Sequence, residues 1–514
     1  MKKTVLRLLA VLMVLMLLLP GCSRYPHFDD LEYERPDVVG LEQLMEQTLQ
    51  AAETETDVKK LMESVYEYYD QYHWFYTNYS LANIHYSGDL TDIYWEQEYN
   101  WCMEKSAQVD AGFDQLMYAL ADCGLREELE AEEYFGEGYF DDYEGESIWD
   151  ETFTDMMDQE SALITEYYGL SSEEYTLQTR TKMEELFTKL VKLRYQIAQY
   201  AGYDSYVDFA YDFYYYRDYT PEQERLLLEQ VRQELVPLYR EMAVSNVWDL
   251  WGKASAEEEN LEFARGAVKE MGGVLQAAFR NMERSGLYNI SYGENKYPAS
   301  FETYLSYYSV PYVFMNPQGT INDKLTLVHE FGHFANDYAC GGSYAGVDVA
   351  EIYSQGLEYL SLFYGEDTED LAAIKMADSL MVYVEQAAYA SFEQGVYALE
   401  EQHITKERIA EVMEQVIKDF GLDIWNMSGH DYASVPHFFT NPLYVISYVV
   451  SNDAALQFYA LEQEEAGKGL ALYEEALDSQ EAYFLAFLTE TGLESPFEEG
   501  RMAIMRQIFE EILE

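Results

Sequence analysis

Apolar and polar residues alternate with helical spacing along most of this chain, and the pattern predicts a mainly helical protein. From Gly40 to about Trp251 the sequence predicts a series of long amphipathic helices. Their boundaries carry ordinary helix signals. Thr220-Pro-Glu-Gln223 has the form of a capping box with proline at the first helical position, and Gly202 stands just after the helix expected to end near Ala201.

The segment from Leu287 to Asn316 departs from this pattern. It is rich in Tyr, Ser, Val and Phe, and its last part, Pro311 to Asn316, predicts a β-strand. Residues 317–320 then predict a turn, and Asn322 to about Cys340 predicts a helix. We therefore expect a small β-sheet beside this helix in an otherwise helical fold.

The first residues carry a separate signal. Lys2, Lys3 and Arg7 form a basic start. They precede an apolar run, Leu8 to Leu19, which is too short to span a bilayer comfortably and matches the core of a signal peptide. The run ends in Leu-Pro-Gly-Cys22, which resembles a bacterial lipobox. We therefore expect a protein held by a lipid on Cys22 at the extracytoplasmic face of the bacterial cell membrane. An ordinary secretory signal and an uncleaved anchor are the alternatives.

Charge narrows the range of partners. The chain has 95 acidic against 32 basic residues and a formal net charge of −63. Such a field repels nucleic acid and anionic lipid surfaces, so no nucleic-acid partner is expected. The simplest interpretation of the acidity is solubility, and steering of cationic peptides is the alternative.

Cysteine usage argues against a cysteine-based framework. Apart from Cys22, only Cys102, Cys123 and Cys340 occur, and there is no CxxC motif. A disulfide framework or a cysteine zinc site is therefore not expected. The sequence leaves open whether Cys102 and Cys123 form a bridge.

The predicted helix after residue 322 contains an HExxH motif, His329-Glu330-Phe-Gly-His333. Positions i and i+4 share one face of a helix, so both imidazoles can bind one metal ion. Neutral imidazole suits Zn²⁺, and Glu330 is placed to act on a water molecule rather than to bind the metal. The alternative is a histidine pair that only packs or caps.

A catalytic zinc site needs a third protein ligand, and two carboxylates are available downstream. Glu351 and Glu358 are seven residues apart, about two helical turns, so they share a face. One can bind the metal while the other holds a histidine ring through its free N–H. Spacing alone does not choose between them, and for Glu351 a solvated acidic face is a further alternative.

These features divide the chain into four expected parts. They are a signal peptide at 1–21, a membrane tether at 22–40, an N-terminal helical region at 41–250 and a zinc-binding catalytic region at 251–514. No linker between them is long enough to imply independently folded domains.

The segment from Pro311 to His333 resembles the strand, turn and helix of the oligoendopeptidase F group, in the thimet oligopeptidase superfamily of gluzincins. The segment from Glu351 to Glu358 resembles that family's second zinc helix. The resemblance covers roughly residues 180 to 510 and is weak before residue 180. It implies one Zn²⁺ ion per chain with Glu358 as the third ligand, and therefore a ligand set of His329, His333 and Glu358.

A later stretch, from Pro436 to Tyr448, is similar to a family segment with one histidine and several tyrosines. In the family, these residues contact the substrate and stabilise a tetrahedral oxyanion. The resemblance therefore implies this role for His437, Tyr444 and Tyr448. For His437 the alternative is a histidine satisfied within the core.

The family resemblance also implies a fold and a substrate class. The expected fold is a helical zincin in which helices surround a deep channel that excludes folded proteins. The implied activity is that of a zinc metalloendopeptidase that cleaves internal bonds of oligopeptides. Separately, we expect the protein to be a monomer. We further expect the strand from Pro311 to Asn316 to be able to pair with an extended peptide.

Two other functions remain possible from the sequence. One is a gluzincin exopeptidase of the carboxypeptidase type, which has similar ligand spacing. The other is a peptide-binding lipoprotein without catalytic activity. Cleavage of a peptide blocked at both ends would separate an endopeptidase from both alternatives.

Overall fold

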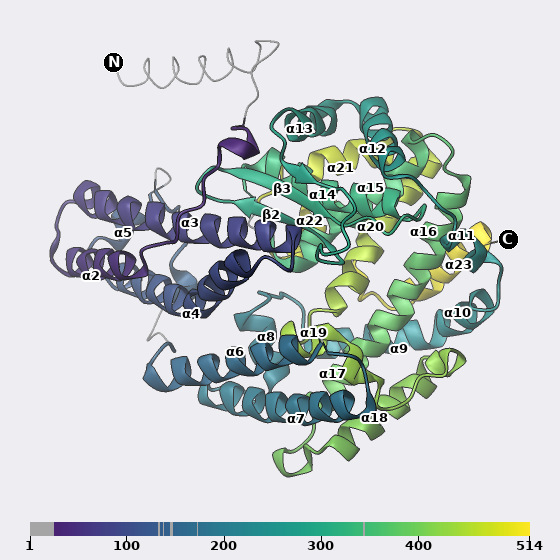
Figure 1. Cartoon of the computed structure of the whole chain (residues 1–514), viewed down its shortest axis with the longest axis horizontal. Helices are drawn as coiled ribbons and strands as arrows, with labels where there is room; N and C mark the ends of the chain where they lie inside the picture. The colour runs from purple at the N-terminus through teal and green to yellow at the C-terminus, as the bar shows by residue number, and fades with distance from the viewer. Residues whose placement is uncertain are drawn as a thin grey trace.

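The secondary structure of the protein is mainly helical, as the computed structural model in Figure 1 shows. The predicted signal peptide and Cys22 lie outside the described residues, which are 25–131, 134–136, 138–143, 148–171, 173–342 and 345–513. In this part of the chain, one three-stranded sheet packs on the helix that carries the HExxH motif. The predicted mainly helical fold with a small sheet beside this helix is confirmed.

The first helices form an arm that projects to one side of the molecule (Figure 1). Buried side chains such as Leu61, Phe75, Leu116 and Phe140 give this arm a core of its own. The core closes by about residue 140, well before the predicted end of the N-terminal region at 250. The arm consists of α2 (Val38–Thr54), α3 (Val58–Gly88), α4 (Ile93–Ala121), α5 (Arg126–Leu129) and the 3-10 turn η2 (Asp141–Tyr143).

The next helices pack into the core of the main body. Phe187 on α7, for example, contacts Phe392 and Phe438, with ring centroids 6.2 and 6.4 Å apart. Residues before and after position 250 therefore share one core, which an amphipathic pattern does not reveal because it shows which face is buried but not what covers it. These helices are α6 (Glu151–Ser171), α7 (Leu177–Tyr200), α8 (Tyr206–Phe213), α9 (Pro221–Glu234), α10 (Val236–Met242) and α11 (Val247–Trp251).

The segment expected to be a membrane tether, residues 22–40, is described from Tyr25 onward, and its first part lies on the body. Tyr25 is buried and packs edge-on against Tyr338, with ring centroids 5.6 Å apart. Phe28, in the 3-10 turn η1 (Phe28–Asp30), packs on Tyr312 of the sheet at 4.4 Å. This part of the segment is therefore docked on the body rather than extended away from it.

The small sheet has strand order β1-β3-β2. The central strand β3 (Val310–Met315) pairs in parallel with β1 (Tyr288–Asn289) and antiparallel with β2 (Ser300–Leu305). The expectation that β3 pairs with an extended peptide is wrong, because both of its sides are occupied. An edge of the sheet belongs instead to β2. Two helices precede the sheet, α12 (Glu257–Met271) and α13 (Gly273–Arg284).

The remaining helices complete the main body of the molecule in Figure 1. At the centre, the largely buried α20 packs along α15. These elements are α14 (Asp323–Cys340), α15 (Val347–Tyr364), α16 (Glu369–Met381), the π-helical turn η3 (Val382–Gln386), α17 (Ala387–Tyr397), η4 (Glu401–His403), α18 (Lys406–Asp419), η5 (Leu422–Trp425), η6 (Asp431–Ser434), α19 (Pro436–Thr440), α20 (Ile446–Glu464), α21 (Lys468–Ala476), α22 (Phe484–Thr491) and α23 (Arg501–Leu513).

Two further sequence questions are answered by the described residues. Cys102, Cys123 and Cys340 are free thiols, so the bridge that the sequence left open is not formed. None of the helices described is both long and apolar enough to cross a membrane.

Candidate metal centre

The turn between β3 and α14 fixes the direction of the HExxH helix. The carboxylate of Asp323 accepts hydrogen bonds from the backbone N–H groups of Gln318, Gly319 and Thr320, at 3.0, 2.8 and 3.1 Å. Gly319 has a positive φ of 76°, which a glycine adopts without strain. The predicted strand, turn and helix are therefore confirmed, with the helix beginning at Asp323.

Helix α14 crosses α15 at Gly332, inside the HExxH motif. A Cβ atom on Gly332 would lie only 2.6 Å from Cα of Ser354, so a side chain at this position would clash with the backbone of α15. Glycine permits this close approach because it has no side chain. The contact brings the histidine-bearing face of α14 against the part of α15 that carries the two candidate glutamates.

His329, His333 and Glu351 form a cluster with the geometry of a metal site. Their ligand atoms all lie within 4.8 Å of one another. Oε2 of Glu351 is 3.5 Å from Nε2 of His329 and 3.9 Å from Nε2 of His333. Ligands of a tetrahedral Zn²⁺ ion lie about 3.4 Å apart, so small side-chain movements would let this donor set fit zinc. Two imidazole nitrogens and one carboxylate leave a fourth position open, as in catalytic zinc sites.

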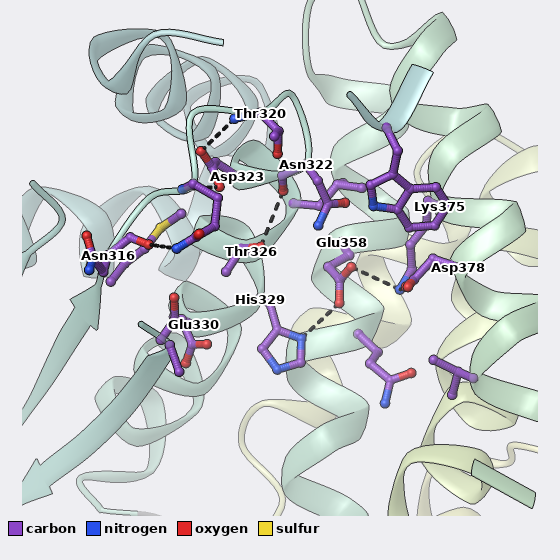
Figure 2. Close-up of a pocket in the computed structure, with 18 of the residues that line it drawn as sticks. Asn316, Thr320, Asn322, Asp323, Thr326, His329, Glu330, Glu358, Lys375 and Asp378 are labelled. Carbon is purple, nitrogen blue, oxygen red and sulfur yellow. Dashed lines mark hydrogen bonds and ion pairs between the residues drawn. The ribbon is translucent and has the colours of Figure 1, made fainter. Parts of the chain in front are cut away.

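Glu358, the third ligand predicted from the sequence, has a different place. Its Oε1 lies 2.8 Å from Nδ1 of His329, the ring nitrogen on the side away from Glu351. Its Oε2 lies 2.9 Å from Nζ of Lys375, so both oxygens are engaged by groups other than the two Nε2 atoms that face Glu351 (Figure 2). The geometry therefore favours Glu351 as the third ligand and gives Glu358 the task of holding the His329 ring.

Sequence spacing could not choose between Glu351 and Glu358 because the two residues lie at different heights along the helix. Glu351 and Glu358 share a face of α15, but seven residues separate them by about 10 Å along its axis. Only the point at which α14 crosses α15 decides which carboxylate reaches the Nε2 atoms. That crossing is set by Gly332 and Ser354, a tertiary contact that one sequence does not reveal.

Glu330 lies on the sheet side of His329, whereas Glu358 lies on the other side (Figure 2). Its side chain is buried, and its carboxylate accepts a hydrogen bond from the backbone N–H of Glu302 on β2. Burial raises the pKa of Glu330 to about 7. A carboxyl group with this pKa is suited both to accept and to return a proton near neutral pH.

The structure also brings together His437, Tyr444 and Tyr448. Their ring centroids are 5.3 to 6.0 Å apart. The hydroxyl of Tyr444 donates to Oε1 of Glu351 at 3.0 Å, and the hydroxyl of Tyr448 lies 3.4 Å from Nε2 of His437. Burial raises the pKa of both tyrosine hydroxyls, so both remain proton donors at neutral pH.

Buried polar side chains from distant helices hold the backbone that carries His437. Arg194 on α7 donates hydrogen bonds to the carbonyl oxygens of Phe438 and Phe439 at 2.8 and 2.5 Å, and it pairs with Glu160 on α6 at 2.6 Å. A guanidinium group at the end of the short helix α19 satisfies carbonyl groups that have no partner within the helix. The position of His437 therefore depends on the packing of α6 and α7 against α19.

A cavity of about 650 Å³ opens beside the cluster (Figure 2). Its walls come from the end of β3, the start of β2, the turn before α14, and helices α15 and α16. They also include the π-helical turn η3, a kind of turn often found at functional sites. Residues from the candidate site that line it are His329, Glu330, Glu358 and Tyr448. The volume is that of a cavity for a small molecule or a few peptide residues.

Sequence reasoning missed Lys375. It lies on α16 among apolar residues, and it is 1% exposed. A lysine inside an otherwise apolar stretch was the available signal, since a buried lysine needs a carboxylate partner. The sequence could not show that this partner is Glu358, because the two residues meet only when α15 and α16 pack together.

A helical body, a small sheet, and an HExxH helix crossed by a second helix that supplies a carboxylate together define a helical zincin. Comparison with known proteins shows which members of this class the chain is similar to. Residues 28–147 match the Peptidase M3 N-terminal domain family. The matched region corresponds to the arm, where the family motifs of the sequence were weak.

One curated relative and two solved structures agree with this match. Over 169 residues the chain is 30% identical to oligopeptidase PepF of Bacillus subtilis strain 168. This alignment covers 29% of this chain and only 25% of that protein. An X-ray structure of a protein provisionally named oligoendopeptidase F has a TM-score of 0.83 at 20% identity, covering 95% of this chain and 98% of that chain. PZ peptidase A, solved with an inhibitor, has a TM-score of 0.82 at 21% identity, covering 95% and 99%. The predicted resemblance to the oligoendopeptidase F group is confirmed.

Proposed function

We propose that this protein is a zinc metalloendopeptidase that hydrolyses internal peptide bonds of oligopeptides. The observation that carries the proposal is the cluster of His329, His333 and Glu351 with Glu330 beside it, next to a cavity. The Peptidase M3 match and the oligoendopeptidase fold support a peptidase that depends on a metal. Within this proposal Glu351, and not Glu358, is the third zinc ligand.

The chemistry follows from these residues. His329, His333 and Glu351 would hold a zinc ion, which when bound lowers the pKa of a water molecule and polarises a peptide carbonyl. Glu330 acts as the general base that accepts the proton of the attacking water. It then delivers this proton to the amine of the leaving peptide. Its raised pKa, about 7, allows both transfers near neutral pH.

His437, Tyr444 and Tyr448 are proposed to stabilise the tetrahedral oxyanion. Tyr444 and Tyr448 are neutral donors held beside the cluster, and such donors are most effective where water is excluded. The hydroxyl of Tyr444 donates to Glu351 in this structure and would turn from this acceptor to the substrate oxygen. His437, close to the hydroxyl of Tyr448, would support the same group.

One observation favours an endopeptidase over a carboxypeptidase. A carboxypeptidase needs a cation for the free carboxylate at the end of its substrate. Among the described residues that line the cavity, Lys375 is the sole lysine or arginine, and it is already engaged by Glu358 and Asp378. The cavity therefore offers the terminal carboxylate of a peptide no unpaired basic side chain from this part of the chain.

The proposal can be tested on purified protein from residue 23 onward. Bound zinc would be measured first, and then the cleavage of a quenched peptide that is blocked at both ends. Glu330→Gln should retain the metal and lose activity by a factor of about 10²–10⁴. Glu407→Gln, at an exposed glutamate on α18, is the control and should behave as the unaltered protein. Cleavage of unblocked peptides alone would favour the exopeptidase, and equal activity of Glu330→Gln would contradict the mechanism.

We also propose that the mature protein is held at the extracytoplasmic face of the membrane by a lipid on Cys22. The support is the apolar run Leu8 to Leu19 followed closely by this cysteine. Cells expressing the full chain would be labelled with a fatty-acid analogue. Label in the unaltered protein and its loss in Cys22→Ser are expected, whereas equal labelling of both would contradict the proposal.

A further inference from the structure

Lys375 is a buried cation at the rear of the proposed metal centre. Its side chain is 1% exposed, and its Nζ lies 2.9 Å from Oε2 of Glu358. Asp378 is 3.5 Å from the same Nζ, and the ring centroid of Tyr359 is 4.7 Å away. Figure 2 shows Lys375, Glu358 and His329 in a row, joined by two interactions.

The order of these contacts determines which ring nitrogen of His329 is free to bind a metal ion. Lys375 occupies Oε2 of Glu358, which leaves Oε1 to accept a hydrogen bond from Nδ1–H of His329 at 2.8 Å. When Nδ1 carries the proton, the lone pair of Nε2 is free for a metal ion. That Nε2 atom is the one that lies 3.5 Å from Glu351.

We propose that Lys375 is a positioning residue for the metal centre. Acting through Glu358, it fixes the His329 ring in the tautomer and orientation that expose Nε2 to the metal. The inference rests on the proposed metal-binding function of His329, His333 and Glu351.

The same contact explains which glutamate remains available as a ligand. A carboxylate buried without a partner would be drawn to any nearby cation, including a metal ion. Lys375 supplies a fixed cation and so keeps Glu358 away from the Nε2 atoms of the two histidines. Among the described residues, no lysine or arginine pairs with Glu351, whose carboxylate instead contacts Tyr444, Ser354 and the two histidines. Lys375 thus resolves the choice between the two glutamates that spacing along α15 leaves open.

Lys375 can be tested by metal affinity, measured by competition with a zinc chelator, and by the visible spectrum of the cobalt-loaded protein. Lys375→Met should weaken zinc binding about tenfold and change the cobalt spectrum, the size of effect known for partners that orient a ligand. Lys375→Arg keeps a cation at Glu358 and should bind nearly as the unaltered protein does. Lys406→Met is the matched control, because it removes a lysine that pairs with Glu185 at the surface, 30% exposed.

A double variant separates positioning from simple neutralisation of a buried charge. Lys375→Met with Glu358→Gln removes both charges of the buried pair and leaves only Asp378, whose side chain is 36% exposed, without the cation, so it should fold even where Lys375→Met alone does not. If Lys375 positions the ring through Glu358, this double variant binds zinc about as weakly as Glu358→Gln alone, about 10–100-fold more weakly than the unaltered protein. Full recovery of zinc affinity in the double variant would overturn the inference, and so would an affinity within twofold of the unaltered value in Lys375→Met.

This readout is independent of peptide cleavage. If neither the unaltered protein nor any variant cleaves peptides, the proposed peptidase activity is wrong. The zinc affinities still show whether Lys375 positions the His329 ring. If the unaltered protein cleaves peptides and Lys375→Met binds zinc normally, the reaction stands and the positioning role fails.

Discussion

The backbone N–H of Leu443 donates a 2.7 Å hydrogen bond to Oε1 of Glu393, a glutamate that is 1% exposed. Leu443 has a φ of 65°, a left-handed conformation that costs a non-glycine residue about 1–2 kcal/mol. The next residue is Tyr444, whose hydroxyl contacts Glu351. The bond between Glu393 and Leu443 therefore holds a strained turn that aims Tyr444 at the proposed metal centre.

Loss of this bond should affect turnover more than metal binding. Glu393→Ala leaves the N–H of Leu443 without a partner and is expected to lower the free energy of unfolding by about 1–3 kcal/mol. It should also lower kcat, because Tyr444 is no longer held, while zinc affinity stays unchanged. Glu393→Gln retains the acceptor oxygen and is the matched control. An unchanged kcat in a folded Glu393→Ala protein would refute the link.

Glu393 also predicts a pH dependence of stability. Burial raises its pKa from the ordinary 4.5 to about 8, so the folded protein holds this proton more tightly than the unfolded chain does. Its contribution to stability is complete below about pH 4.5 and is lost as the pH rises through about 8. Glu393→Gln cannot titrate, so its stability relative to the unaltered protein should increase over this window, by at most about 1.4 kcal/mol per pH unit. Urea denaturation at several pH values would check this, and a constant difference between the two proteins would contradict it.

The exchange of roles between the two glutamates of α15 is directly measurable. Glu351→Gln removes a proposed zinc ligand and should abolish tight zinc binding. Glu358→Gln removes only the partner of the His329 ring and should weaken zinc binding about 10–100-fold. Chelator competition on both proteins gives the order of the two effects. The reverse order would restore Glu358 as the third ligand.

Substitution of a proposed oxyanion-stabilising tyrosine should lower kcat and leave zinc binding unchanged. Tyr444→Phe removes one proposed donor to the oxyanion and is expected to lower kcat by a factor of about 10²–10³ with little change in zinc content. Tyr364→Phe is a suitable control. Tyr364 is the last residue of α15, far from the proposed metal centre, and its hydroxyl donates a hydrogen bond to Glu462 on α20. Steady-state kinetics on a blocked peptide would measure both. An effect of Tyr444→Phe on KM alone would argue for substrate binding instead of oxyanion stabilisation.

The helix crossing at Gly332 predicts a severe effect from one methyl group. Gly332→Ala would place Cβ 2.6 Å from Cα of Ser354, so the helices must separate. We expect a loss of about 1–3 kcal/mol in the free energy of unfolding, together with weaker zinc binding. Gly266→Ala is the control, because that glycine lies inside helix α12 and a Cβ there would meet no atom within 4 Å, so alanine should be neutral or stabilising.

Local features of the fold could be predicted from the sequence because their causes are local. The capping box at Thr220 is present, and so is the turn that leads into α14. The HExxH histidines share a face because helical geometry places them there. The choice of Glu351, by contrast, depends on where two helices cross, and the partner of Lys375 depends on how α15 and α16 pack. Such contacts join residues through the fold, and no spacing along a single chain encodes them.

The docking of Tyr25 has a consequence for how an anchored protein would sit. Only Ser23 and Arg24 separate Cys22 from Tyr25, a reach of about 10 Å at most. A lipid on Cys22 would therefore hold the surface around Tyr25 and Phe28 close to the lipid headgroups, leaving the protein little freedom to swing. The orientation of the whole protein over the bilayer, and so the direction from which peptides would reach the proposed site, would be set by two aromatic side chains.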